Sequence, residues 1–121
     1  MVIFRVDGNP LPKQSARVTK HGAYIPARIK AWQDQIAWAA KVAMAGEDPY
    51  TGDVALETIF YRKDARRCDI DNLNKAVWDA CNGIVWEDDA QVVEVKSYKY
   101  TGQSRPGVHI TVWRLYDPIP R

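Results

Sequence analysis

Acidic residues are concentrated in one short part of this 121-residue chain, and this constrains the fold more than any other feature. Seven of the fifteen Asp and Glu residues lie between Asp69 and Glu94, where Lys75 is the only basic residue. Carboxylates that are brought together repel one another, so the fold must either spread them over solvent or hold them around a cation. Mg²⁺ is the usual cation for such a group because it prefers oxygen ligands.

The basic residues occupy two other segments. No acid interrupts the chain between Asp7 and Asp34, and a second basic group surrounds Asp64 just before the acidic segment. Positive segments around an acidic centre suit a polyanion that is held by its phosphates and cleaved beside a metal. The alternative is that residues 13–30 form only a solvated surface loop. The net charge of +2 conceals this separation. The basic residues that we predict to bind DNA are Lys13, Arg17, Lys20, Arg28, Lys30, Arg62, Lys63, Arg66 and Arg67.

The length predicts one domain over residues 1–121, which buries about two-thirds of its unfolded surface. No apolar run approaches the roughly twenty residues that span a bilayer, and the N-terminus lacks the pattern of a signal peptide. Cys68 and Cys81 have neither a metal-binding spacing nor a secretory context, so we expect reduced thiols in a cytoplasmic protein. We expect no membrane contact, no organic cofactor and a mobile tail over residues 117–121.

Hydrophobic periodicity predicts an α+β fold in which two main helices pack on one mixed β-sheet, in the order β-α-β-α-β-β. The expected strands cover residues 2–6, 54–61, 92–100 and 108–115. The first helix is expected to begin at Pro26 and end before Gly46, and the second to run from about Asp71 to Asn82. We predict that the last two strands form an antiparallel pair with a hairpin-like connection. We also predict that residues 11–22 form a surface loop. The strand order is not determined by these patterns.

Two groups of acids flank the second helix. Asp69 and Asp71 lie at its predicted start, where negative charge is favoured, and Lys75 lies one turn after Asp71 on the same face. Asp88 and Asp89 follow the helix and must return through folding to complete a site. A metal held by both groups can bind a phosphate oxygen, activate water for in-line attack and support the leaving oxygen. Lys75 can then offset charge in the transition state.

Each of these residues also has a purely structural interpretation. Asp69 or Asp71 can cap the helix, a position in which aspartate is favoured. Asp71, Lys75 and Asp79 can form a stripe of solvated salt bridges along the helix, worth tenths of a kcal/mol per pair. The Asp-Asp pair after the helix can form a polar turn. The spacing alone leaves the metal site and the solvated surface both open.

Aromatic residues add one further candidate. Tyr61 stands beside the basic run and is the best candidate for stacking on a base. Trp32, Trp86 and Trp113 lie in apolar patterns that are more typical of a hydrophobic core.

Two motifs carry a family resemblance. The central one comprises Asp69, Asp71-Asn72, Lys75, Asp79, Asp88-Asp89 and Gln91-Val92-Val93, and the N-terminal one comprises Gly8-Asn9-Pro10-Leu11-Pro12-Lys13 with Arg17. Together they closely resemble the RusA-type Holliday junction resolvases, a family of small phage-associated endodeoxyribonucleases. The resemblance covers most of the chain, and the central motif is its more specific part.

The resemblance implies a set of metal-binding catalytic carboxylates and a catalytic lysine. The carboxylates are Asp69, Asp71 and Asp89, with Asp88 as a neighbouring metal-binding acid, and the lysine is Lys75. It also implies Mg²⁺, for which Mn²⁺ can substitute, and a homodimer that cleaves four-way junction DNA in recombination and repair. Symmetry independently favours the dimer, because resolution needs two paired nicks and one chain holds one site. The alternatives are a nuclease for other branched DNA, such as forks or flaps, and a non-catalytic DNA-binding module.

Overall fold

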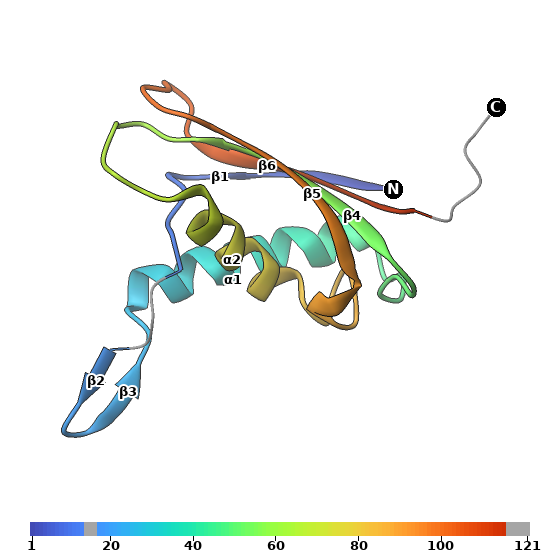
Figure 1. Cartoon of the computed structure of the whole chain (residues 1–121), viewed down its shortest axis with the longest axis horizontal. Coiled ribbons are helices and arrows are strands. Elements are labelled where there is room, and N and C mark those ends of the chain that lie inside the picture. The colour runs from blue at the N-terminus through green and yellow to red at the C-terminus, as the bar shows by residue number, and fades with distance from the viewer. Residues whose placement is uncertain (14–16, 116–121) are drawn as a thin grey trace.

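The computed structural model describes residues 1–13 and 17–115, so the expected mobile tail at 117–121 lies outside the described part of the chain. In chain order its elements are β1 (Val2–Asp7), β2 (Arg17–Thr19), β3 (Gly22–Tyr24), α1 (Ala27–Met44), β4 (Val54–Tyr61), α2 (Ile70–Cys81), the 3₁₀ helix η1 (Asp89–Gln91), β5 (Val92–Tyr100) and β6 (Gly107–Arg114). The four long strands form one mixed sheet, and α1 and α2 both cover the same face of it (Figure 1). The α+β class with one mixed sheet and two helices is therefore confirmed.

The helices form where the apolar spacing predicts them. In α1 the buried side chains of Ile29, Trp32 and Ile36 recur every three to four residues and face the sheet. The helix ends where Ala45 adopts a left-handed conformation with φ of 52° and Gly46 follows with φ of 81°. In α2 all of the residues that were expected to point inward are buried; they are Leu73, Val77, Ala80 and Cys81.

The core lies between this helical layer and the sheet. Strand β4 occupies an inner position in the sheet, where it pairs in antiparallel fashion with β6 and in parallel with β5. Its alternate residues Leu56, Thr58 and Phe60 are fully buried under the helices. Glu57 and Tyr61 alternate with these residues along β4 and so point to the opposite face of the sheet. None of the described helices covers this face, which we call the open face (Figure 1). Within the described residues, no helix is long and apolar enough to cross a membrane.

The structure decides the strand order, which the sequence patterns left open. The sheet runs β1-β6-β4-β5, so β5 and β6 point in opposite directions but are separated by β4. The predicted hairpin between the last two strands is therefore wrong. The connection after Tyr100 instead passes over the end of β4, where the Gln103 amide donates to the Arg62 carbonyl at 2.9 Å. Strand β6 can then pair along its whole length with both β1 and β4, which satisfies more backbone groups than a two-strand hairpin.

Two smaller expectations also need correction. Part of the segment that was predicted as a loop forms an antiparallel ribbon of β2 and β3, which projects from the body beside the start of α1 (Figure 1). Trp32 and Trp86 are core residues as predicted. Trp113 is only partly buried, because its position in β6 alternates with Val112 and so faces the open side of the sheet.

Candidate active site

Three hydrogen bonds join the start of α2 and the segment before it to the sheet. Thr58, Asn74 and Ser97 form a closed triangle, in which the Asn74 amide donates to the Ser97 oxygen at 2.6 Å and the Thr58 hydroxyl donates to the Asn74 carbonyl at 2.7 Å. The Thr58 and Ser97 hydroxyls also lie 2.7 Å apart. The Lys99 ammonium donates to the Cys68 carbonyl at 2.6 Å. Because Ser97 meets Asn74 and Lys99 meets Cys68, α2 runs in the opposite direction to β5.

Two carboxylates and one ammonium are left exposed at this end of α2. Asp69 occupies the N-cap position, but its side chain makes no capping hydrogen bond. Asp71 accepts only a local bond, from the Asn72 amide at 2.9 Å. Lys75 is exposed, and the ion pairs among the described residues do not include it. The side chains at the start of α2 are therefore available to a ligand.

The salt-bridge stripe along α2, which was the structural alternative for Asp71, Lys75 and Asp79, does not form among the described residues. Asp79 is paired with the Lys13 ammonium, which comes from the N-terminal segment, and it also accepts a long bond of 3.4 Å from Gln33. The Lys13 amide donates to the Asn72 carbonyl at 2.9 Å, so this segment lies along the helix. Asp79 therefore anchors the segment around Lys13, and the charge of Lys13 is partly neutralised within the protein.

The second group of acids lies at the other end of α2. Asp89 accepts a hydrogen bond of 2.9 Å from the indole nitrogen of the buried Trp86. Burial raises the pKa of the Cys81 thiol to about 12, and the negative charge of Asp89 also raises it. Asp89 therefore lies near Cys81, the last residue of α2. Asp88 accepts from the Ala90 amide at 3.2 Å and forms a capping box with Gln91. Asp88 thus caps the short helix η1, as the polar-turn interpretation proposed.

The two acidic groups are therefore separated within one chain. The twelve residues of α2 span about 18 Å between them, and Figure 1 shows η1 and the segment before α2 at opposite ends of the helix. Among the described residues, no group of three or more His, Cys, Asp or Glu side chains is arranged to hold a metal ion. The donors have the oxygen chemistry that suits Mg²⁺, but the described part of one chain does not bring three of these acids together.

The two basic segments meet beside the exposed acids. A cavity of about 540 Å³, which we call the basic cavity, is lined by Asn9, Leu11, Pro12, Arg28, Arg62, Lys63, Asp64, Arg66, Arg67 and Cys68. Arg28 comes from α1 and the other cations from the connection between β4 and α2, so residues that are far apart in sequence share one surface. Because Cys68 precedes Asp69, the basic cavity opens directly next to the start of α2.

The predicted DNA-binding residues do not all have the same environment. Arg62 is buried, and its guanidinium donates to the Arg66 carbonyl at 2.7 Å and to the Pro10 carbonyl at 3.4 Å. Its charge supports the wall of the basic cavity from inside. Lys30 is paired with Asp34 at 3.3 Å on the surface of α1. The exposed cations at the basic cavity are Arg28, Lys63, Arg66 and Arg67, and Lys20 is exposed at the tip of the ribbon.

Comparison with known proteins decides the family. Residues 7–113 match the family described as endodeoxyribonuclease RusA. The chain belongs to the RusA family. It is 24% identical over 113 residues to a crossover junction endodeoxyribonuclease RusA of Aquifex aeolicus (strain VF5), with 90% of this chain and 88% of that protein covered. It is 33% identical over 94 residues to proteins of the same name from Escherichia coli (strain K12) and Enterobacteria phage 82, with 74% of this chain and 78% of each relative covered.

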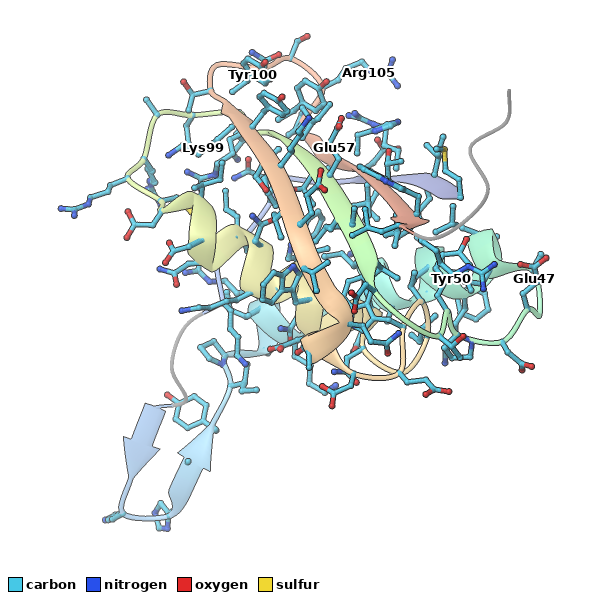
Figure 2. All side chains as sticks on the ribbon, turned by 45° about the vertical axis from the view of Figure 1, so that its right-hand side comes forward. Glu47, Tyr50, Glu57, Lys99, Tyr100 and Arg105 are labelled. Atoms are coloured by element: carbon cyan, nitrogen blue, oxygen red, sulfur yellow. The ribbon has the colours of Figure 1, made fainter. Side chains whose placement is uncertain are left out.

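The RusA-family match includes both ends of α2 and one residue that sequence reasoning missed. Lys99 projects from β5 toward the segment before α2 (Figure 2). Burial raises the pKa of the Cys68 thiol, whereas the charges of Arg62 and Lys99 oppose this rise, so both cations lie near the start of α2. The alternation of side chains along β5 indicates from the sequence that Lys99 lies on the same face of the strand as Ser97. The sequence did not reveal that this face meets α2.

Proposed function

We propose that this RusA-family protein is a dimeric, Mg²⁺-dependent endodeoxyribonuclease that resolves Holliday junctions in recombination and repair. The observation that carries the proposal is the position of the exposed Asp69 and Asp71 carboxylates, directly beside a cavity lined by cations from two segments. Cations hold the phosphates of a DNA backbone, and carboxylates beside them supply oxygen ligands for a metal at one phosphodiester. The names of the relatives, crossover junction endodeoxyribonucleases, support the same substrate.

The separation of the acids along α2 gives the dimer a chemical role. If two copies pack with their α2 helices antiparallel about a two-fold axis, Asp89 of one copy approaches Asp69 and Asp71 of the other. Each of the two equivalent sites then contains carboxylates from both chains. A single chain would hold only part of each site, which agrees with the absence of a three-acid group among its described residues.

Strand β5 offers a surface for this packing. Among the described strands it pairs only with β4, so one of its edges has free backbone groups, and such an edge is a template for another strand. Val93 and Val95 on this strand are 54% and 39% exposed. An antiparallel β5 pair across the two-fold axis would bury these valines and place the neighbouring α2 helices side by side. The expected interface is therefore apolar at β5 and acidic at its two ends.

In this arrangement Asp69 and Asp71 of one chain and Asp89 of the other would hold Mg²⁺. When bound, the ion supplies positive charge that polarises the scissile phosphate and lowers the pKa of bound water. Asp88 contributes by holding η1, and thereby Asp89, in place. The cations of the basic cavity would hold the flanking phosphates, and positioning of this kind accounts for much of the rate in phosphoryl transfer.

A synthetic four-way junction tests the proposed function directly. Nicking at two strands of like polarity is expected in the presence of Mg²⁺ and is expected to stop when EDTA is added. A fork, a flap and a linear duplex of the same sequence serve as competitors. Equal cutting of forks or flaps would favour the broader branched-DNA nuclease, and binding without cutting under all metal conditions would favour a non-catalytic module.

Alanine in place of Lys75 is expected to remove most cleavage while junction binding changes little. The Lys75 ammonium is unpaired within the described residues and lies one turn from Asp71, so it can offset charge at the scissile phosphate. Arginine at this position is expected to rescue poorly, because a planar guanidinium differs in geometry from a compact ammonium. Single-turnover cleavage and junction gel shifts separate the two effects. Normal cleavage by Lys75→Ala would show that this lysine is only a surface charge.

Replacing Arg66 and Arg67 together by alanine is expected to reduce the salt dependence of junction binding. If each contacts one phosphate, the slope of log affinity against log salt falls by roughly two in magnitude. Lys41→Ala provides the control, because this exposed lysine lies in the last turn of α1, away from the basic cavity. An equal slope for the double variant and the wild-type protein would place the DNA on another surface.

A further inference from the structure

The open face of the sheet carries a second cavity, about 290 Å³ in volume, which we call the tyrosine cavity. Its walls are formed by Arg5, Tyr61, Gln103, Ser104 and Arg105. These residues come from β1, from the end of β4 and from the connection between β5 and β6. Two arginines, a serine, a glutamine and a tyrosine therefore line one small space. Each of these residue types carries a side-chain group that can donate a hydrogen bond to an anion, although the Gln103 amide nitrogen already donates to the Thr101 carbonyl at 3.0 Å.

A column of stacked groups borders the tyrosine cavity. The Tyr61 and Tyr100 rings are stacked with their centroids 5.9 Å apart and their planes at 19°. The Arg5 guanidinium lies over the Tyr61 ring, 5.4 Å from its centroid. Tyr100 is the outer member of this column and is 48% exposed. Its free surface is suited to stacking on a further aromatic ring.

The position of Arg5 is built into the fold. Its Nε donates to the Asp7 carboxylate and its Nη2 to the Arg105 carbonyl, both at 2.9 Å. The guanidinium reaches Tyr61 by crossing over Gly107 at the start of β6. A Cβ atom on Gly107 would lie only 2.7 Å from Nη2, so a larger residue here would displace the guanidinium. The Arg5 guanidinium is therefore held in place before any ligand arrives, and its charge is partly neutralised by Asp7.

The tyrosine cavity and the basic cavity lie on opposite faces of the same sheet end. Tyr61 lines the tyrosine cavity, and the next residue, Arg62, lines the basic cavity. The Arg62 amide donates to the Tyr100 carbonyl at 2.8 Å, so this end of the sheet is closed by backbone hydrogen bonds. Figure 2 shows Tyr100 and Arg105 together at this end, with Lys99 on the side of α2. A DNA strand that leaves the basic cavity can therefore reach the tyrosine cavity around the sheet end.

We propose that the tyrosine cavity is a subsite for one unpaired nucleotide of the DNA, a proposal that deepens the proposed function and depends on it. The phosphate lies against Arg5, Ser104 and Arg105, and the base stacks on the exposed ring of Tyr100. A base inside a duplex is already stacked on its neighbours, so only an unpaired or unstacked nucleotide can use this ring. The branch point of a junction supplies such nucleotides, whereas a linear duplex does not. The subsite thus provides a reason for selectivity toward branched DNA.

A fluorescent single-stranded oligonucleotide tests this subsite without cleavage. The oligonucleotide carries one 2-aminopurine, whose fluorescence is quenched when it stacks on an aromatic ring, and binding is measured without Mg²⁺. Tyr100→Ala is expected to abolish the quenching and to weaken binding about tenfold. Tyr98→Ala is the matched control, because Tyr98 lies on the same face of β5 and is 45% exposed but pairs with Ile59, away from the tyrosine cavity. It is expected to behave like the wild-type protein.

Further measurements separate the possible outcomes. Arg105→Ala is expected to lower the salt slope of oligonucleotide binding by roughly one, as loss of one phosphate contact requires. Equal quenching and affinity for Tyr100→Ala and Tyr98→Ala would overturn the subsite. A change in sedimentation by Tyr100→Ala with unchanged oligonucleotide binding would also overturn it, because the face would then be a protein interface. Binding through Tyr100 by a wild-type protein that cuts no junction would retain the subsite and refute the resolvase function.

Discussion

Asparagine in place of Asp71 is expected to lower junction cleavage more than about a hundredfold while the protein still folds and binds junctions. The Asp71 side chain is exposed at the start of α2, and its one hydrogen bond is accepted from the Asn72 amide. The carbonyl oxygen of asparagine can accept the same bond, so the local structure is kept. The substitution removes the negative charge and the anionic ligand, and junction binding persists or tightens because one repulsive charge next to the basic cavity is gone.

The measurement is single-turnover nicking of a four-way junction in Mg²⁺, together with a gel shift in EDTA. Asp34→Asn is the matched control, since it removes the same charge from an exposed aspartate of α1 that pairs with Lys30. The control is expected to cleave normally. Full cleavage by Asp71→Asn would remove Asp71 from the site, and a loss of binding as large as the loss of cleavage would assign it to DNA contact.

Mixing two inactive variants is expected to restore activity. In the proposed dimer, each site takes Asp71 from one chain and Asp89 from the other. When one chain carries Asp71→Asn and the other carries Asp89→Asn, one of the two sites therefore contains both substitutions and the other contains neither. If subunits exchange at random, half of the dimers are mixed and nicking returns to about a quarter of the wild-type rate. Each variant alone is inactive. The restored nicks fall on one strand of a junction, so paired resolution stays low.

The same mixture distinguishes the two possible arrangements of the site. If each site drew all its carboxylates from one chain, every site in the mixed dimer would carry one defect and no activity would return. The control is a mixture of Asp69→Asn and Asp71→Asn chains, whose defects lie at the same end of α2 and which is expected to stay inactive. Sedimentation that shows only monomers, with and without junction DNA, would refute the shared site altogether.

Local sequence patterns were sufficient to predict the two helices, including α2, at whose ends the candidate site residues lie. The spacing of Ile29, Trp32 and Ile36 located α1, and the buried positions of α2 located its inner face. The same pattern placed Asp69 and Asp71 at a helix start. These features depend on residues within one or two helical turns of one another, so periodicity is enough to predict them. The motif of acids and lysine also pointed to the RusA family, which the match over residues 7–113 confirms.

Contacts between segments that are distant in the sequence could not be predicted from these local patterns. The insertion of β6 between β1 and β4 depends on long-range strand pairing, for which each strand carries the same alternating pattern. The column of Arg5, Tyr61 and Tyr100 assembles from three strands that are far apart in the chain. Lys99 joins the start of α2 for the same reason, because only the pairing of β5 with β4 brings it there.

The chain by itself therefore determined which side chains have the chemistry of a nuclease, and tertiary structure decided which of them can meet. Asp69 and Asp71 stand out in the sequence because local acid density and helix position are local properties. Their distance from Asp89 is set by α2, a rigid rod of about 18 Å whose ends cannot approach each other. In the dimer proposed above, that rigidity is the reason why each site takes its third carboxylate from another copy of the chain, an arrangement that no pattern within a single sequence predicts.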